Sequence, residues 1–241
     1  MIVSSGGVAA VVDYVVESTG NARLPGIMTL GYIAAFSETL ALAVIVAKGI
    51  SPLSEALVSE PEEYVKAACA WALGQIGRHS PDHAKTLAEH AVLSKLLKVM
   101  NLPARNDQTA SGSESLVDLK TKTKRALKSI LEKTLTLEAL EPLLQSSTAT
   151  NILKYVIGQF AKILPNNVAV RRQFVTCGGL QRVQDIATQI RAESDSNSGL
   201  VGTKIGEYIR QINECYPEEI VRYYSPGYSA TLLDKVICKL I

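Results

Sequence analysis

The sequence predicts an all-α protein built as a solenoid of repeated helical units. Two observations predict this fold: apolar residues recur with a helical period, and short sequence markers recur about every 42 residues. In the clearest segment, 65–77, apolar residues fall at positions i, i+3, i+4, i+7, i+8 and i+11, which is one face of an α-helix. A helix of this length is only marginally stable alone in water, so its apolar face must pack against other helices.

The first marker is a small residue followed by an apolar residue at the start of a helical run. With intervals of 42, 42, 45 and 43 residues, it occurs at Gly7-Val8, Gly49-Ile50, Ala91-Val92, Thr136-Leu137 and Gly179-Leu180. A second marker, Gly74-Gln75, recurs two periods later as Gly158-Gln159. This period lies in the range of the armadillo and HEAT classes of α-solenoid.

Composition and charge narrow the class of protein. Of the 241 residues, 47% are hydrophobic and 20% are charged, which indicates a folded chain. The formal net charge of +2 gives no global field that would attract nucleic acid or a membrane. The longest apolar run, 40–47, is far shorter than the roughly 20 residues of a membrane helix. We also expect no signal peptide, because no basic segment precedes an apolar one at the start.

The four cysteines are far apart in the sequence and form no CxxC pair. They are Cys69, Cys177, Cys215 and Cys238. This usage predicts reduced thiols of an intracellular protein.

The first half of the chain contains helical patterns separated by capping signals. The helices expected there are 8–17, 25–47, 52–59, 65–77, 81–90 and 92–100. Ser59-Glu60-Pro61-Glu62 is interpreted as a capping box that starts helix 65–77. Glu60, Glu62 and Glu63 could mimic catalytic carboxylates, but we interpret them as residues that favour the positive end of the helix dipole. Ser80-Pro81-Asp82 has the same character before helix 81–90.

The second half resumes the pattern after a polar interruption. Residues 102–115, LPARNDQTASGSES, lack periodicity and predict a flexible inserted loop, and 193–199 predicts a second one. The helices expected in this half are 116–133, 137–145, 151–164, 171–175, 180–192 and 200–214.

These elements predict a single domain of about five units with a C-terminal cap that covers the end of the stack. The expected boundaries are 1–47, 48–90, 91–135, 136–178 and 179–214 for the units and 215–241 for the cap. Residues 1–5 are interpreted as the end of a preceding repeat, so the chain is expected to be a fragment of a longer solenoid.

The segment ACAWALGQI, with Trp71 and Gln75 at i and i+4, resembles the armadillo signature AAWAL-x-N-I with glutamine in place of asparagine. Longer runs, including ILKYVIGQFAKILPNN and CYPEEIVRYYSPGYSATLL, make the chain similar to the C-terminal half of the armadillo proteins of the ciliary and flagellar central pair. The insertion at 102–115 does not match that family. The resemblance implies a right-handed superhelix of three-helix repeats. It also implies a non-enzymatic scaffold in the cytoskeleton of the axoneme that supports motility by binding central-apparatus proteins or tubulin and microtubules.

In that family the long helices line a concave groove, where aromatic side chains and amides one turn later face a bound chain. Carried over to this sequence, the groove residues are Tyr32, Trp71, Gln75, Tyr155, Gln159 and Gln211. An amide can both donate to and accept from a partner backbone, and an aromatic ring supplies rigid contact area. The alternative is that these residues pack between repeats. Because glutamine is longer than asparagine, we expect peptide recognition to differ from that of nuclear-import armadillo proteins.

A second candidate surface is basic. Residues 95–133 contain nine Lys or Arg against four Asp or Glu, a local excess of +5. The proposed patch for an acidic partner such as tubulin tails comprises Lys120, Lys122, Lys124, Arg125 and Lys128. The alternative is a solvated helix face. Nucleic acid is not expected, since no aromatic residues are interleaved with these cations.

No other residues predict chemistry. His79 and His83 have a metal-ligand spacing, but Pro81 separates them. Gly178-Gly179 before a helix lacks the lysine of a phosphate-binding loop. We therefore expect no catalytic residue, metal or cofactor. Two alternatives remain open: a soluble cargo or peptide adaptor that uses the groove, and an enzyme, which would need a pocket of converging titratable groups.

Overall fold

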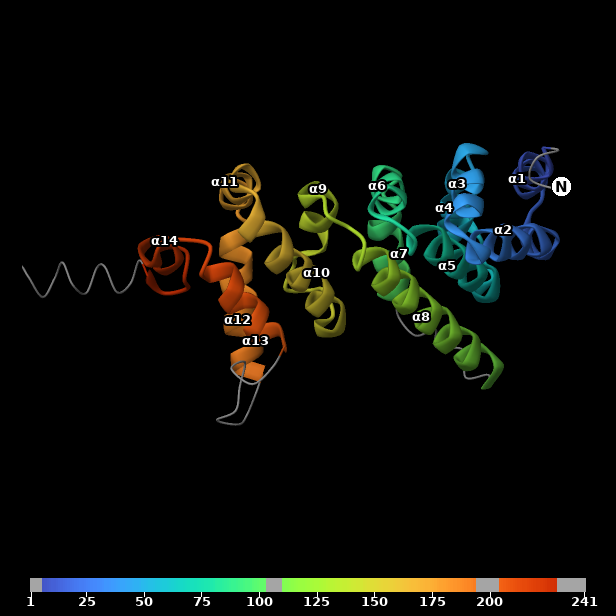
Figure 1. The fold of residues 1–241 in the computed structure, drawn as a ribbon. Helices are drawn as coiled ribbons and strands as arrows, with labels where there is room; N and C mark the ends of the chain where they lie inside the picture. The colour runs from blue at the N-terminus through green and yellow to red at the C-terminus, as the bar shows by residue number, and fades with distance from the viewer. Residues whose placement is uncertain (1–5, 103–109, 194–203, 229–241) are drawn as a thin grey trace, which may run out of the picture. The chain divides into compact units, whose positions relative to one another are not determined.

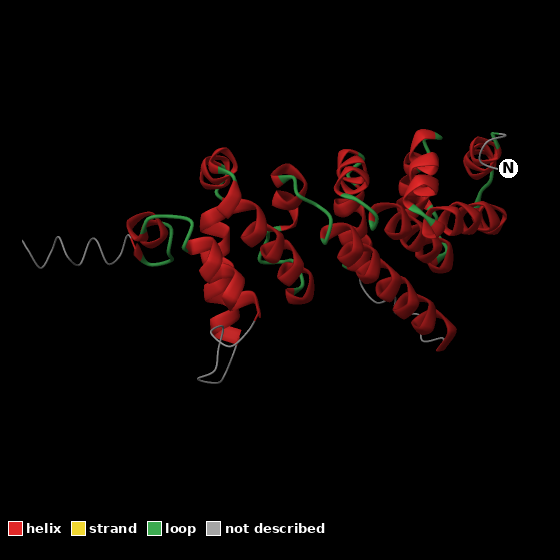
Figure 2. Ribbon diagram, viewed as in Figure 1, coloured by secondary structure: helices red, strands yellow, loops and turns green. Residues whose placement is uncertain are grey.

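The computed structural model describes residues 6–102, 110–193 and 204–228. Regular structure in these ranges is helical throughout (Figure 2). The chain divides into two compact units, Met1–Ala139 and Leu140–Ile241. The short helix α9, Leu137–Leu140, spans the division.

The first unit is built from α-helices and one 3-10 turn. Its elements are α1 Gly7–Glu17, η1 Gly20–Arg23, α2 Leu24–Phe36, α3 Glu38–Val46, α4 Ile50–Ser59, α5 Glu63–Gly77, α6 Pro81–Glu89, α7 Val92–Met100 and α8 Ala110–Leu131. In Figure 1, α3 and α6 lie at one edge of this unit, and α2, α5 and α8 lie at the other. Helices α3 and α4 pack against α5, and α7 packs against both α6 and α8, so each triplet has the element order expected of a three-helix repeat.

Helix α5 is the centre of the first unit, because it packs against both α2 and α8. Small residues permit this close packing. A Cβ on Gly31 of α2 would lie 2.2 Å from Cζ3 of Trp71, and one on Gly74 of α5 would lie 2.9 Å from the Cα of Ala126 in α8. The glycines of the recurring markers therefore set the distance between successive long helices.

The second unit has the same kind of elements. They are η2 Glu141–Leu143, α10 Thr150–Ile163, η3 Leu164–Asn166, α11 Val168–Thr176, α12 Gly179–Glu193, α13 Lys204–Asn213 and α14 Glu218–Tyr223. Its core includes Phe160 and Phe174, whose ring centroids are 4.8 Å apart. A Cβ on Gly158 would lie 2.9 Å from Cε2 of Tyr208. An aromatic ring of α13 therefore packs on a glycine of α10, as Trp71 of α5 packs on Gly31 of α2.

Long-range side-chain hydrogen bonds in both units agree with the period seen in the sequence. Ser54 Oγ accepts from Lys95 Nζ across 41 residues, and the Arg171 carbonyl accepts from the Tyr216 hydroxyl across 45. Arg182 donates to Glu141 across 41 residues. Each bond joins one repeat to the next, which is how a solenoid is stabilised between neighbours.

The predicted helix 25–47 is wrong as a single element, because the chain breaks at Ser37. Ser37 is extended, with φ −157° and ψ 161°, and its hydroxyl accepts a hydrogen bond from Leu40 N at 3.2 Å. It is therefore the N-cap of α3. The prediction at Ser80 is confirmed, since its hydroxyl accepts from the backbone N–H of His83.

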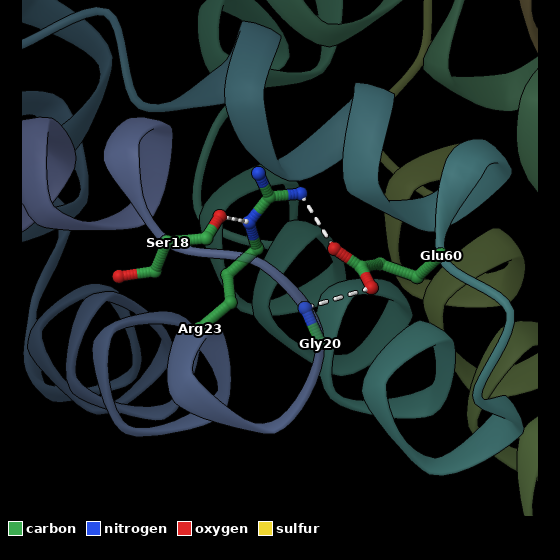
Figure 3. Close-up of polar contacts among 4 residues, drawn as sticks. All are labelled: Ser18, Gly20, Arg23 and Glu60. Atoms are coloured by element: carbon green, nitrogen blue, oxygen red, sulfur yellow. Dashed lines mark hydrogen bonds and ion pairs between the residues drawn. The ribbon is translucent and has the colours of Figure 1, made fainter.

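The predicted capping box at 59–62 is wrong. Ser59 ends α4, and α5 begins at Glu63 without a side-chain cap. The Glu60 carboxylate turns back to the first repeat instead, where Oε2 accepts from Gly20 N at 3.1 Å and Oε1 from Arg23 Nη1 at 2.7 Å (Figure 3). A charged partner competes better for this carboxylate than a helix end does.

Other boundaries also differ from expectation. Helix α8 begins at Ala110, so 110–115 is helical rather than part of the predicted loop, while 103–109 lies outside the described residues. The predicted helix 137–145 is only α9 followed by one 3-10 turn at Pro142, since proline cannot continue the hydrogen bonding. Glu193 ends α12, and the rest of the predicted loop at 193–199 lies outside the described ranges, as do residues 1–5 and the tail from 229.

No described helix is by itself long and apolar enough to cross a membrane. Helices α3 and α4 meet the criteria of length and composition only when joined, across a bend of 79°.

Candidate partner-binding face

Tyr32 and Trp71 meet edge to face on the surface formed by α2 and α5. Their ring centroids are 4.9 Å apart with an interplanar angle of 66°. Trp71 is half-buried over Gly31, so it packs between repeats, while the Tyr32 side chain stays 63% exposed. The tryptophan therefore supports a tyrosine ring that remains open to a partner.

Phe36 extends this surface along α2. It follows Tyr32 by four residues, so both rings lie on one face of the helix, and it is 84% exposed. An exposed aromatic pair of this kind is unusual on a folded surface unless it binds something. Phe36 was not among the groove residues predicted from the sequence, although its spacing from Tyr32 was the available signal.

Polar contacts from the two residues that follow α5 fix the end of α2 that carries this aromatic pair. His79 Nε2 lies 2.7 Å from the Ala34 carbonyl oxygen, and Arg78 Nη2 donates to the Ala35 carbonyl at 3.0 Å. These contacts satisfy carbonyl groups that a helix end leaves unpaired. The face formed by Tyr32, Phe36, Trp71 and Gln75, called the α2–α5 face below, is thus held rigidly by the next repeat.

Gln75 lies one turn after Trp71 on α5 and is half-buried. Within the described residues no hydrogen bond occupies its side-chain amide. An amide in this position has one acceptor and two donor hydrogens to offer to an extended backbone.

The aromatic and amide residues of the second unit are arranged differently. Tyr155 is half-buried, and Gln159 is 3% exposed, with an Oε1 that has no hydrogen-bond partner among the described residues. Gln211 is exposed on α13. The structure therefore leaves Gln211 on the surface and places the Gln159 amide inside the second unit.

The contacts of Tyr208 correct the repeat register on α13. Tyr208 packs on Gly158 as Trp71 packs on Gly31, so Tyr208 matches Trp71, and the predicted groove residue Gln211 follows it by three residues instead of four. Counted from Tyr208, the position of Gln75 falls on Ile212, which is fully buried. Gln211 is one residue away from it.

All five residues of the predicted basic patch lie on α8, and two of them form ion pairs. Lys122 Nζ is 2.7 Å from Asp118 Oδ2, and Lys128 Nζ is 3.9 Å from Glu132 Oε1. The remaining cations of the patch, Lys120, Lys124 and Arg125, form no ion pair with a described residue, and the last two are exposed. The uncompensated charge therefore lies on the middle of α8.

Two of the three described cysteines have raised pKa values. Cys69, Cys177 and Cys215 are free thiols. Burial raises the pKa of Cys69 to about 12, and the negative charge of Glu60 adds to that shift. Burial also raises the pKa of Cys215. Raised values favour the neutral thiol, which is the less reactive form.

The histidines and the glycine pair that were considered as metal or phosphate sites make contacts that stabilise the fold. His79 contacts the Ala34 carbonyl and His83 contacts Ser80, and no three His, Cys, Asp or Glu side chains of the described residues converge to hold a metal ion. Gly178 adopts a positive φ of 78° before α12, and Gly179 packs tightly against Phe174. This glycine pair forms a helix junction.

A cavity of about 500 Å³ lies beside α13 and α14 in the second unit. Its described lining mixes both charge signs, including Glu207, Arg210 and Glu214. Arg210 Nε is 3.8 Å from Glu214 Oε1, and both side chains are largely exposed. An open site with mutually compensating charges lacks the desolvated acid or base that catalysis needs.

Sequence comparison finds two similar curated proteins. The chain is 52% identical over 184 residues to "Sperm-associated antigen 6" of Homo sapiens, and the mouse protein of the same name gives the same values. The match covers 76% of this chain and 32% of each relative, so the chain spans about a third of their length. No family model matches the chain.

Among solved structures, the chain resembles designed armadillo repeat proteins. One of them, solved in complex with the peptide (KR)4, is 16% identical to this chain with a TM-score of 0.53. The match covers 93% of this chain and 88% of the designed protein. Another, "YIII(Dq)4CqI", has a TM-score of 0.52 at 16% identity, and the match covers 89% of this chain and 84% of the designed protein. The fold is therefore all-α and of the armadillo type, as the sequence predicted.

Proposed function

We propose that this chain, a homologue of sperm-associated antigen 6 with an armadillo-type fold, is a non-enzymatic protein-binding scaffold of the ciliary and flagellar axoneme. The observation that carries the proposal is the exposed aromatic pair on the α2–α5 face, with Tyr32 63% and Phe36 84% exposed. Exposed aromatic rings on a rigid support are typical anchors of protein interfaces.

The α2–α5 face has the chemistry expected for an extended protein segment. Two aromatic rings offer apolar area, and the Gln75 amide offers both a donor and an acceptor to a backbone. The Tyr32 ring is held by its edge-to-face contact with Trp71, and the end of α2 that carries Phe36 is held by the contacts of Arg78 and His79 with α2. Such preorganisation lowers the entropy lost on binding.

The charge of α8 favours an acidic partner. The unpaired cations Lys120, Lys124 and Arg125 lie on the helix that packs directly against α5. A segment bound on the α2–α5 face would therefore be expected to carry acidic residues near this helix. The acidic tails of tubulin have that character, and a central-apparatus protein with an acidic stretch would satisfy the same requirement.

The alternative of a soluble peptide adaptor uses the same face and differs in location and partner. One designed armadillo protein of similar fold was solved with a peptide of alternating Lys and Arg. Basic residues on α8 disfavour such a peptide here, because like charges would face one another. We therefore rank the axonemal scaffold above an adaptor for basic cargo.

The experiment that tests this function is co-sedimentation of the purified chain with microtubules and with isolated axonemal central-apparatus preparations. The proposal predicts sedimentation with at least one of them, weakening as salt is raised from 50 to about 200 mM because screening shortens the range of the attraction. A second set of measurements examines the acidic tails of tubulin by using microtubules from which limited proteolysis has removed them. Absence of binding to both preparations at low salt would contradict the proposal.

A further inference from the structure

We propose that three tyrosines at the end of the described chain form an aromatic cage for an alkylammonium group, of the kind carried by a methylated lysine side chain of a partner protein. The cage comprises Tyr223, Tyr224 and Tyr228, with Asp185 of α12 at its rim. It lies in the second unit and uses none of the residues of the α2–α5 face, so it is a separate site.

The Tyr223 ring is set at a steep angle to each of the other two rings. The centroids of Tyr223 and Tyr224 are 5.0 Å apart with an interplanar angle of 89°, and those of Tyr223 and Tyr228 are 5.7 Å apart at 64°. Rings arranged in this way form walls that face different directions. Cation-binding aromatic sites need several such walls, because each ring contributes through its negatively polarised face.

The local sequence builds this arrangement through a tight turn. Helix α14 ends at Tyr223, and the segment Ser225-Pro226-Gly227 reverses the chain so that Tyr228 returns to the helix. The N–H of Tyr228 donates to the Ser225 carbonyl at 3.2 Å. Gly227 has a φ of +85°, a conformation that glycine adopts without strain.

A hollow of about 430 Å³ opens between these rings and α12. Its described lining is aromatic and small-residue surface together with Gln181 and Asp185, and it contains no lysine or arginine. The Tyr223 side chain is 62% exposed. A large aromatic side chain left this open, beside two others, has apolar area available for a ligand.

The charges at the hollow select a cation. The Asp185 carboxylate is exposed and forms no ion pair with a described residue. The neighbouring cation on α14, Arg222, is already paired with Glu218, with Nη2 2.6 Å from Oε1. One unpaired carboxylate beside three aromatic side chains favours a ligand that is positive and apolar at once. A single carboxylate provides too few oxygen ligands for a calcium or magnesium ion.

Among biological cations a methylated ammonium fits these features better than free lysine. The unmodified ammonium is compact and strongly hydrated, so entry between rings removes water that it binds tightly. Methyl groups replace its N–H donors, spread the charge over a larger apolar surface and lower that cost. Recognition of methylated lysine by aromatic cages uses this physics.

The test is an NMR titration of the full chain, labelled at its tyrosine rings, with two short peptides. One carries Nε-trimethyllysine, and the other carries the neutral tert-butyl isostere, in which carbon replaces the charged nitrogen. We expect the charged peptide to bind at least about tenfold more tightly, a difference of ~1.4 kcal/mol. Equal binding of the two peptides would overturn the proposal, because shape and apolar contact alone would then explain it. Failure of the charged peptide to bind would overturn it too.

Matched variants assign the binding to the cage. Tyr223→Phe keeps the ring face and is expected to bind within about twofold of the wild type, whereas Tyr223→Leu, which keeps apolar volume, is expected to lose most of the preference for the charged peptide. Asp185→Asn should weaken binding and reduce its salt dependence. Tyr32→Ala, on the α2–α5 face, serves as the unaffected control. Retention of the full charge preference by Tyr223→Leu would place the site elsewhere.

Discussion

Arg23 and Glu60 form an ion pair between consecutive repeats, with Nη1 2.7 Å from Oε1 and side chains only 14% and 6% exposed (Figure 3). The same carboxylate accepts from Gly20 N, and Arg23 Nε donates to the Ser18 carbonyl at 2.7 Å. One pair thus connects the turn after α1 to the link between α4 and α5. Because both groups are buried, each depends on the other for its solvation.

Replacement of Glu60 is therefore expected to destabilise the first unit strongly. Glu60→Ala leaves Arg23 buried without its partner, which costs about 3–5 kcal/mol in comparable pairs. Urea denaturation followed by circular dichroism measures the loss. Glu132→Ala, which removes an exposed partner of Lys128, is the control and should cost under about 1 kcal/mol. Equal effects of the two substitutions would show that burial of the Arg23 pair is not important.

Gly74→Ala tests the role of the marker glycines in helix packing. In an open helix this change stabilises by about 1 kcal/mol through helix propensity. Here the new Cβ would lie 2.9 Å from the Cα of Ala126, which is backbone and cannot rotate away. We expect a net destabilisation of about 1–3 kcal/mol from overpacking, measured by denaturant unfolding. A stabilised variant would contradict the proposed contact between α5 and α8.

Cys69 gives a prediction about pH. Burial raises its pKa from 9.0 to about 12, so between these values the unfolded chain releases the thiol proton while the folded chain keeps it. The stabilising contribution of the neutral thiol is therefore complete below pH 9 and declines as pH rises toward 12. The difference in unfolding free energy between wild type and Cys69→Ala should shift in favour of the variant over this range. A constant difference would contradict the shift.

Charge reversal on α8 tests the basic patch. Lys124→Glu combined with Arg125→Glu is expected to weaken binding to microtubules or to an acidic central-apparatus partner by at least about tenfold at low salt and by less at high salt. Lys162→Glu, an exposed lysine of α10, is the matched control and should change binding little. Co-sedimentation over a salt series provides the measurement. Equal weakening by the control would indicate only a dependence on net charge.

The repeat was readable from the sequence partly because glycines that the packing requires recur with its period. Gly31, Gly74 and Gly158 each sit where a Cβ would meet the next long helix, so they recur with the structural period. The aromatic residue that packs on such a glycine could also be predicted from the sequence where the spacing of the repeats is regular, as at Trp71. On α13 the predicted amide Gln211 follows Tyr208 by three residues instead of four, so the predicted register was one residue off.

Other features depended on tertiary contacts that local patterns do not encode. The capping box at 59–62 was locally consistent, but Arg23, 37 residues earlier, captures the Glu60 carboxylate. The break at Ser37 was concealed by the apolar run that follows it, although serine before Glu38 is itself a cap signal. The burial of Gln159 was not predictable, because its spacing from Tyr155 is the same as that of Gln75 from Trp71.

The central claim is that the α2–α5 face binds the axonemal partner. The most direct measurement is the affinity of the full chain for central-apparatus preparations or microtubules, whichever binds the wild type, after Tyr32→Ala and Phe36→Ala are combined. Both rings are exposed, so the fold should persist, and circular dichroism verifies this. Val168→Ala on α11, another exposed apolar residue, is the control. We predict that the double variant loses at least about 2 kcal/mol of binding free energy, roughly thirtyfold in affinity, while the control binds normally. Wild-type affinity in a correctly folded double variant would contradict the claim.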